Sequence, residues 1–135
     1  MKNNTFKKDY LALVSGIITQ DKQTVIAPIA RKETSIIERC IRDDGDYAET
    51  DIELIHTYGN YSLIRCKLKT GRTHQIRVHT KHIGHPLLGD TLYGTSSSLI
   101  SRQALHAHMV KFIHPVTKQF IQIESNLPQD MSKLL

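Results

Sequence analysis

The sequence contains no long apolar run and no signal-peptide pattern. None of its apolar stretches approaches the roughly 18 to 20 residues that a helix needs to cross a bilayer. The N-terminal segment MKNNTFKKDY also lacks the apolar core of a signal peptide. These absences predict a cytoplasmic protein with no membrane partner.

Cysteine is scarce, which bears on disulfides and metals. Cys40 and Cys66 are the two cysteines and do not form a CxxC pair, so the sequence suggests neither a disulfide framework nor a zinc knuckle. Both are expected to be buried thiols. Four histidines lie between residues 74 and 85, and histidines three apart on a helix can share a face. They have no cysteines or clustered carboxylates beside them, so no metal site is predicted.

Acidic residues are missing from the stretch between residues 65 and 89. The same stretch supplies six fixed positive charges: Arg65, Lys67, Lys69, Arg72, Arg77 and Lys81. Such a distribution is typical of a surface that binds phosphate. It is equally compatible with a solvated face whose counter-charges come from the acidic residues between 49 and 53. The net charge of +5 favours an anionic partner only weakly, so both interpretations stay open at this point.

The 135 residues fit one domain that is rich in strands. Extended segments are predicted at residues 10–19, at 24–31 with Pro28 at a strand end, and at 35–42 before the turn DDGD. A hairpin is predicted over residues 48–71, around Tyr58-Gly59-Asn60, because Gly and Asn tolerate positive φ.

The second half of the chain is predicted to hold the helices and a final hairpin. A helix is expected within residues 72–84, ending at Gly84. Residues 85–101 read as a loop in which the tract 95–98 is flexible, residues 105–125 as a hairpin, and residues 128–135 as a short helix with Pro128 in its first turn. The predicted class is α+β, with a largely antiparallel mixed sheet flanked by helices.

LKTGRTHQIRVHTKHIGHPLLGDTLYG, residues 68–94, resembles the long signature of RluA/RluD-type RNA pseudouridine synthases nearly residue for residue. KKDYLALVSG at residues 7–16 is similar to the tyrosine motif of that family, and RQALHAHMVKFIHP at residues 102–115 to its closing strand. The resemblance covers the chain from about Lys7 onward. It implies isomerisation of uridine to pseudouridine in RNA, without a cofactor or metal. Ribosomal RNA is the expected partner and transfer RNA the alternative.

The resemblance also implies roles for individual residues. Arg77 matches the arginine that pairs with a catalytic aspartate, and Tyr10 matches the tyrosine that packs against the extruded uracil. Ile76 is expected on the other side of the base. Arg72 and His74 are expected either to contact RNA phosphate or to brace the corner that presents Arg77. Two further lysines, Lys69 and Lys81, are expected to bind RNA.

The sequence departs from the family pattern at the catalytic acid. The His-Arg-Leu-Asp segment expected upstream of the tyrosine motif is not found in it. Asp9 is a poor substitute, because a strand would point it to the face opposite Tyr10. Asp90 is expected to be a hydrogen-bond acceptor in a turn rather than a nucleophile.

Three functional hypotheses follow. Residues 1–135 are interpreted as one partial domain, the C-terminal portion of a pseudouridine synthase catalytic domain, inactive alone, with Arg77 lacking its anionic partner. An exposed sheet edge should then cause self-association or marginal stability. The alternatives are a non-catalytic RNA-binding module and a purely structural domain.

Overall fold

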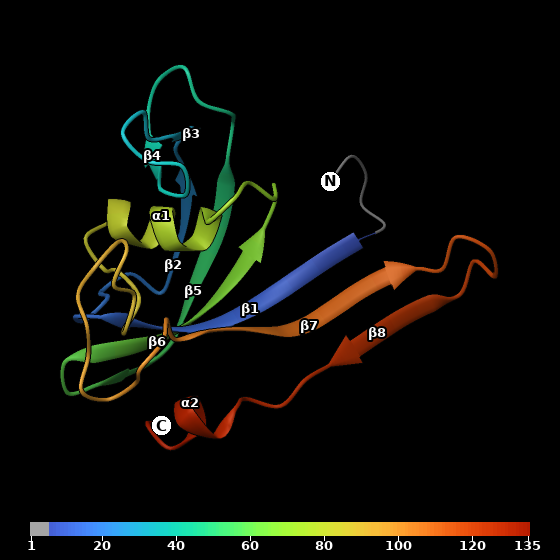
Figure 1. The fold of residues 1–135 in the computed structure, drawn as a ribbon. Helices are drawn as coiled ribbons and strands as arrows, with labels where there is room; N and C mark the ends of the chain where they lie inside the picture. The colour runs from blue at the N-terminus through green and yellow to red at the C-terminus, as the bar shows by residue number, and fades with distance from the viewer. Residues whose placement is uncertain (1–5) are drawn as a thin grey trace.

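Residues 6–135 are described by a computed structural model, and they form an antiparallel sheet with two helices (Figure 1). The sheet has the order β2-β5-β6-β1-β7-β8, built from β1 (Phe6–Ser15), β2 (Lys22–Ile26), β5 (Glu49–Tyr58), β6 (Tyr61–Leu68), β7 (Leu105–Ile113) and β8 (Phe120–Glu124). Every neighbouring pair is antiparallel. The α+β class is confirmed, although the described strands include no parallel pair that would make the sheet mixed.

Three smaller pieces complete the described chain. A separate hairpin joins β3 (Ile29–Arg31) to β4 (Arg39–Ile41), and the helices are α1 (Gln75–His82) and α2 (Gln129–Ser132). No helix within residues 6–135 is both long and apolar enough to span a membrane. Residues 1–5, part of the stretch in which no signal peptide is expected, lie outside the described residues.

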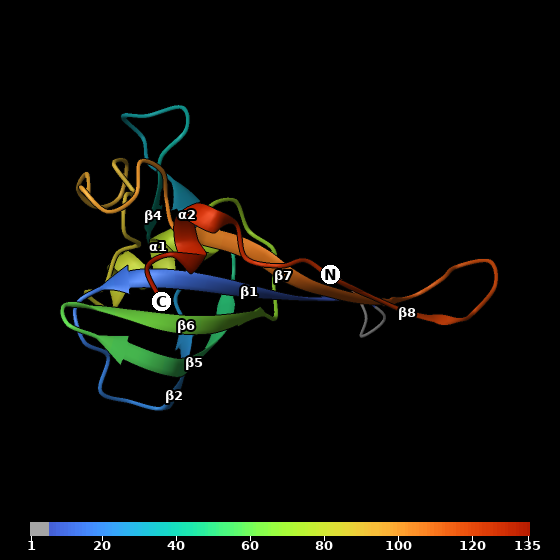
Figure 2. The ribbon, with the colours of Figure 1, turned by 90° about the horizontal axis from the view of Figure 1, so that it is seen from below.

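The two faces of the sheet bury different clusters, because successive side chains of a strand point to opposite faces. Ala12, Ile64 and Cys66 pack with Ile76 of α1. Their neighbours on the other face, including Leu13 and Leu63, pack with Met131 of α2. Burial raises the pKa of the Cys66 thiol to about 12, as expected for a buried structural thiol. Figure 2, which views the molecule from below, shows α2 in front of the sheet.

The predicted hairpin at residues 48–71 is confirmed, but not its turn geometry. Tyr58 pairs with Tyr61, so Gly59 and Asn60 form a two-residue turn. Neither is among the described residues with positive φ, which excludes the primed turns. A bulge at Leu54/His56 adds local twist beside this hairpin.

Several predicted boundaries shift. β1 ends at Ser15 rather than near residue 19, because Gly16 adopts φ 81 and donates its N–H to Asn60 O at 2.8 Å. The segment 24–31 divides at Ala27-Pro28 into β2 and β3, which belong to different sheets. Within 35–42 only Arg39–Ile41 is a strand. Pro28 therefore does mark a strand end, where its missing N–H is tolerated.

Residues 85–101 form a loop as predicted, and part of it lies along β1. The pairing of β1 with β7 ends at Ala12 and Leu105. Beyond that point, residues of the 85–101 loop lie next to β1 in place of β7. Ser15 N donates to Pro86 O at 2.8 Å and Leu88 N to Leu13 O at 2.9 Å. This contact fixes the residues that follow, Gly89 and Asp90, beside α1.

Candidate active site

The strand-to-helix corner before α1 is held by a buried glutamine. Gln75 Oε1 accepts from Thr70 Oγ1 at 2.7 Å and from Arg72 N at 3.0 Å, while its Nε2 donates to Glu49 O and Thr50 Oγ1 at 2.9 and 2.8 Å. All four hydrogen-bonding positions of the amide are thereby used. Gln75 thus ties the end of β6 and the start of β5 to the first turn of α1, a role not predicted from the sequence.

One turn further along α1, His79 extends the same buried network. Its Nδ1 lies 2.9 Å from Thr50 Oγ1 and its Nε2 lies 2.9 Å from Ala27 O. Burial lowers the pKa of His79, so the neutral ring donates from Nε2 and accepts at Nδ1. No group of residues suited to a metal ion occurs among residues 6–135.

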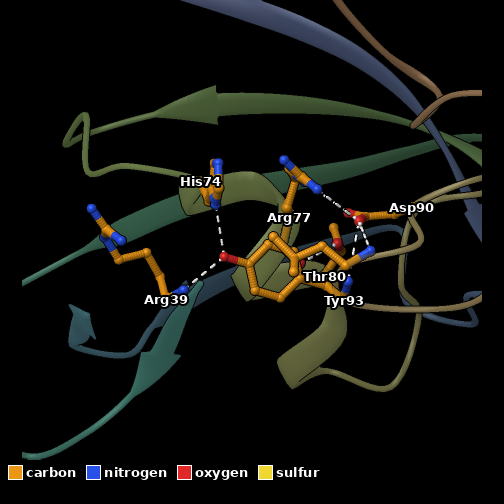
Figure 3. A network of polar contacts seen from close by, with 7 residues as sticks. Arg39, His74, Arg77, Thr80, Asp90 and Tyr93 are labelled. Carbon is orange, nitrogen blue, oxygen red and sulfur yellow. Dashed lines mark hydrogen bonds and ion pairs between the residues drawn. The ribbon is translucent and has the colours of Figure 1, made fainter. Parts of the chain in front are cut away.

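Arg77 forms a bidentate ion pair with Asp90, shown in Figure 3. Nε donates to Oδ2 and Nη2 to Oδ1, each at 2.9 Å. The Arg77 side chain is 16% exposed and that of Asp90 is 0% exposed. The expectation that Arg77 lacks an anionic partner is wrong, because the loop after α1 supplies a carboxylate from within the chain.

Asp90 is fully engaged in structural contacts. Besides Arg77, its Oδ1 accepts from the backbone N–H groups of Leu92 and Tyr93 at 3.2 Å each, which confirms the predicted turn role. Burial opposes its ionisation, but the hydrogen bonds from Arg77 and the two backbone groups outweigh burial and lower the pKa of Asp90. A buried, ionised carboxylate with this set of donors holds Arg77 in place and is unsuited to attack a substrate.

The guanidinium still has one unengaged group. Within the described residues Nη1 of Arg77 has no hydrogen-bond partner, and no buried side-chain nitrogen or oxygen is left unpaired. Nη1 therefore reaches solvent. It can donate to a second carboxylate while Asp90 fixes the opposite edge of the planar group.

Tyr93 links Arg77 to β4 and to the start of α1. The hydroxyl accepts from Arg39 N at 2.8 Å and lies 2.7 Å from His74 Nδ1, while the Arg77 guanidinium lies 5.0 Å from the ring centroid. Burial, together with the charges of Arg77 and Arg39, lowers the pKa of His74. The Tyr93 hydroxyl donates a hydrogen bond to Nδ1 of a neutral His74, so Tyr93 is satisfied as both donor and acceptor (Figure 3).

His74 and Arg72 both make bracing contacts. His74 adopts φ 56 at the N-cap of α1, a conformation uncommon for a residue other than glycine, and is held there by Tyr93. Arg72 Nε donates to Tyr47 O at 2.8 Å. Both residues therefore make contacts of the kind that a bracing role requires, and Arg72 remains exposed.

Tyr10 and Ile76 meet in one cluster on the α1 side of the sheet. Tyr10 pairs with Cys66 of β6 and Ala107 of β7, next to a bulge at Asp9/Tyr10. It is half-buried against the cluster that contains Ile76, which is 4% exposed. Asp9 pairs with Lys67 in the next register position, so it lies on the opposite face as expected.

The basic stretch divides into paired and unpaired charges. Arg65 pairs with Glu53 at 2.8 Å and Lys69 with Asp51 at 3.7 Å, so the counter-charge interpretation holds for these two residues. Lys81 is exposed, with Nζ 5.9 Å from the Tyr93 ring centroid. Lys81 and Arg72, both exposed, remain the basic side chains nearest to Arg77 along the chain.

Comparison with known proteins decides the family. The model of the RNA pseudouridylate synthase family matches residues 1–82, which include Tyr10 and Arg77. The chain belongs to this family. It is 47% identical over 134 residues to the uncharacterized RNA pseudouridine synthase YjbO of Bacillus subtilis (strain 168), covering 99% of the chain and 47% of that protein.

Members named for their substrate also match. The chain is 40% identical to the ribosomal large subunit pseudouridine synthase D of Nitrosomonas europaea, covering 100% of the chain and 42% of that protein. These matches confirm the RluA/RluD-type resemblance of this chain. The chain spans about half the length of the curated relatives it matches.

The fold agrees with solved members of the family. Human RNA Pseudouridylate Synthase Domain Containing 1 superposes with a TM-score of 0.75 at 28% identity, over 90% of this chain and 55% of that one. Human RNA Pseudouridylate Synthase Domain Containing 4 superposes with a TM-score of 0.72 at 18% identity, over 94% of this chain and 60% of that one. This second match shows a likeness of fold alone. The fold of this chain is thus that of the family.

Proposed function

We propose that this chain contributes Arg77 and Tyr10 to the active site of an RNA pseudouridine synthase, and that the catalytic aspartate comes from the half of the relatives that the chain does not match. The supporting observation is the clamped Arg77 guanidinium, with Asp90 on one edge and Nη1 open to solvent. A second carboxylate at Nη1 would be held ionised and oriented. Residues 1–135 are thus proposed to be one part of the catalytic domain, which the other half would complete.

In the proposed reaction, uridine leaves the RNA stack and the bond between uracil N1 and the ribose is broken. A new bond joins uracil C5 to the same ribose carbon, C5 loses its proton to solvent, and N1 takes up a proton. The catalytic carboxylate acts at the sugar or the base, and Arg77 keeps it charged. The Tyr10 ring offers a flat face to the uracil. Ile76 stays a proposed base contact, through the small exposed part of its side chain.

RNA is the proposed partner, held by phosphate contacts from Arg72 and Lys81 and by a weaker contribution from Lys69, whose charge is shared with Asp51. His74 is proposed to act near the RNA chiefly by bracing. The names of relatives such as the Nitrosomonas europaea protein support ribosomal rather than transfer RNA as the proposed substrate. A cytoplasmic location is proposed with it. A non-catalytic RNA-binding module is the second candidate, because the open cations of the α1 corner need no acid to bind phosphate.

Two assays on the chain alone test this proposal. We expect salt-dependent binding to ribosomal RNA but no tritium release from RNA labelled at uridine C5. The double variant Arg72→Ala/Lys81→Ala should lower the slope of log affinity against log salt by about two, whereas Lys22→Ala, on the opposite sheet face, should leave it unchanged. Salt-independent binding would contradict the RNA contacts, and turnover by this polypeptide alone would contradict the external aspartate.

A further inference from the structure

β8 is an edge strand of the six-stranded sheet, and the described chain covers only one of its sides. It pairs with β7 from Met109↔Glu124 to Ile113↔Phe120, and no other described strand lies beside it. Figures 1 and 2 show β7 and β8 extending as an arm away from α1 and the β3–β4 hairpin. The outer side of β8 therefore offers its backbone groups to another strand.

This edge carries few of the features that usually protect an edge strand. The strand FIQIE contains no lysine or proline, and Glu124 is its single charge. Phe120 is 65% and Ile123 is 55% exposed, and Val116 in the connecting turn is 80% exposed. Exposed apolar residues on an unprotected edge are typical of a strand that pairs in the assembled protein.

One face of the arm is apolar across both strands. Val110 lies opposite Ile123 and Phe112 opposite Ile121, and residues paired in an antiparallel ladder share a face. A partner strand that added to β8 would extend this apolar face as well as the ladder. The surface thus fits a polypeptide with a free strand edge and apolar side chains.

The relatives indicate which polypeptide this is. The chain covers 99% of its own length but only 47%, 44% and 45% of three Bacillus subtilis relatives, so each relative carries as much polypeptide again. In the proposed function that part brings the catalytic aspartate to Arg77, so the two halves would have to be in contact.

We propose that the outer edge of β8, with Phe120 and Ile123, is the docking surface for the half of a pseudouridine synthase that this chain does not match. The inference rests on the proposed function, in which that half brings the catalytic aspartate. Strand addition at β8 would join the two halves through a continuous sheet. The exposed edge would then be buried in an interface and would not promote aggregation.

The test is co-expression of the tagged full chain with the unmatched half of Bacillus subtilis YjbO, followed by capture and sedimentation. We expect a soluble one-to-one complex, weakened at least tenfold by Phe120→Lys or Ile123→Lys. The matched control Ile26→Lys, at a 58% exposed isoleucine on the opposite edge strand β2, should leave the complex intact. Thermal unfolding of each variant alone, followed by circular dichroism, checks that the chain still folds.

Three outcomes would overturn the docking inference. These are a YjbO half that is not captured by the soluble chain, equal weakening by Ile26→Lys and Ile123→Lys, and a homodimer that persists when that half is present. The last result would show that the predicted self-association involves a second copy as the occupant of β8. Capture does not depend on turnover, so an inactive complex would count against the proposed function alone.

Discussion

At the scale of single residues, Arg77 shows what a motif can and cannot predict. Its place in the GRTHQIR motif marked it as an acid-pairing arginine, and the structure does pair it with an acid, but with Asp90. The sequence identified Asp90 only as a turn acceptor, because nothing in its local pattern shows that the loop returns it to α1. Tyr93 was missed for the same reason, since its hydroxyl partners lie 19 and 54 residues away.

Asp90→Asn should destabilise the chain at neutral pH. Breaking a buried ion pair costs about 3 kcal/mol, since Arg77 would keep its charge without a partner. The lowered pKa of Asp90 means that its contribution is present above the unfolded-state pKa and is lost as pH falls through the lower folded-state pKa. The difference between the two proteins in urea unfolding should therefore shrink below about pH 4.

Asp130→Asn is the matched control for this prediction. Asp130 also receives two hydrogen bonds from one arginine, Arg102, at 2.9 and 3.0 Å, but their side chains are 37% and 38% exposed. Solvent screens such a pair, so the control should change stability much less. Equal losses in the two variants would contradict a buried clamp at Arg77.

At the scale of elements, the segment after α1 positions the clamp. The sequence predicted a helix within residues 72–84 and a loop beyond it, and α1 does lie there, although it ends at His82, two residues before Gly84. It could not predict that the loop lies along β1 or that Gln75 locks the corner, since these contacts join segments far apart in the chain. Gly89 is where the loop turns toward α1, with φ +72 and Arg102 O where a side chain would begin.

Gly89→Ala should unfold the chain more easily. A Cβ at this position would lie 2.1 Å from Arg102 O, and the combined strain and displacement should cost on the order of 3 kcal/mol. The control is Gly59→Ala, where no heavy atom lies within 4 Å of the added Cβ. Urea unfolding of both variants measures the difference, and a Gly89→Ala protein as stable as the control would rule out this close approach.

At the scale of the whole molecule, the class and most strands followed from hydrophobic patterns, but the sheet order did not. β1 lies between β6 and β7, strands that begin 46 and 90 residues after its last residue, and no local pattern encodes such pairings. The order matters for function because it places Tyr10 of β1 on the same sheet face as α1. It also leaves β8 at the edge of the sheet, where the second half is proposed to dock.

The decisive measurement is tritium release from uridine-labelled ribosomal RNA by the co-purified complex of this chain with the YjbO half. We predict release by the complex, none by either half alone, and a rate at least about 100-fold lower with Arg77→Lys, because lysine cannot hold two carboxylates in a planar fork. Sedimentation of the Arg77→Lys complex controls for assembly. Release by this chain alone, or an unchanged rate with Arg77→Lys, would show that Arg77 does not act on an aspartate from the other half.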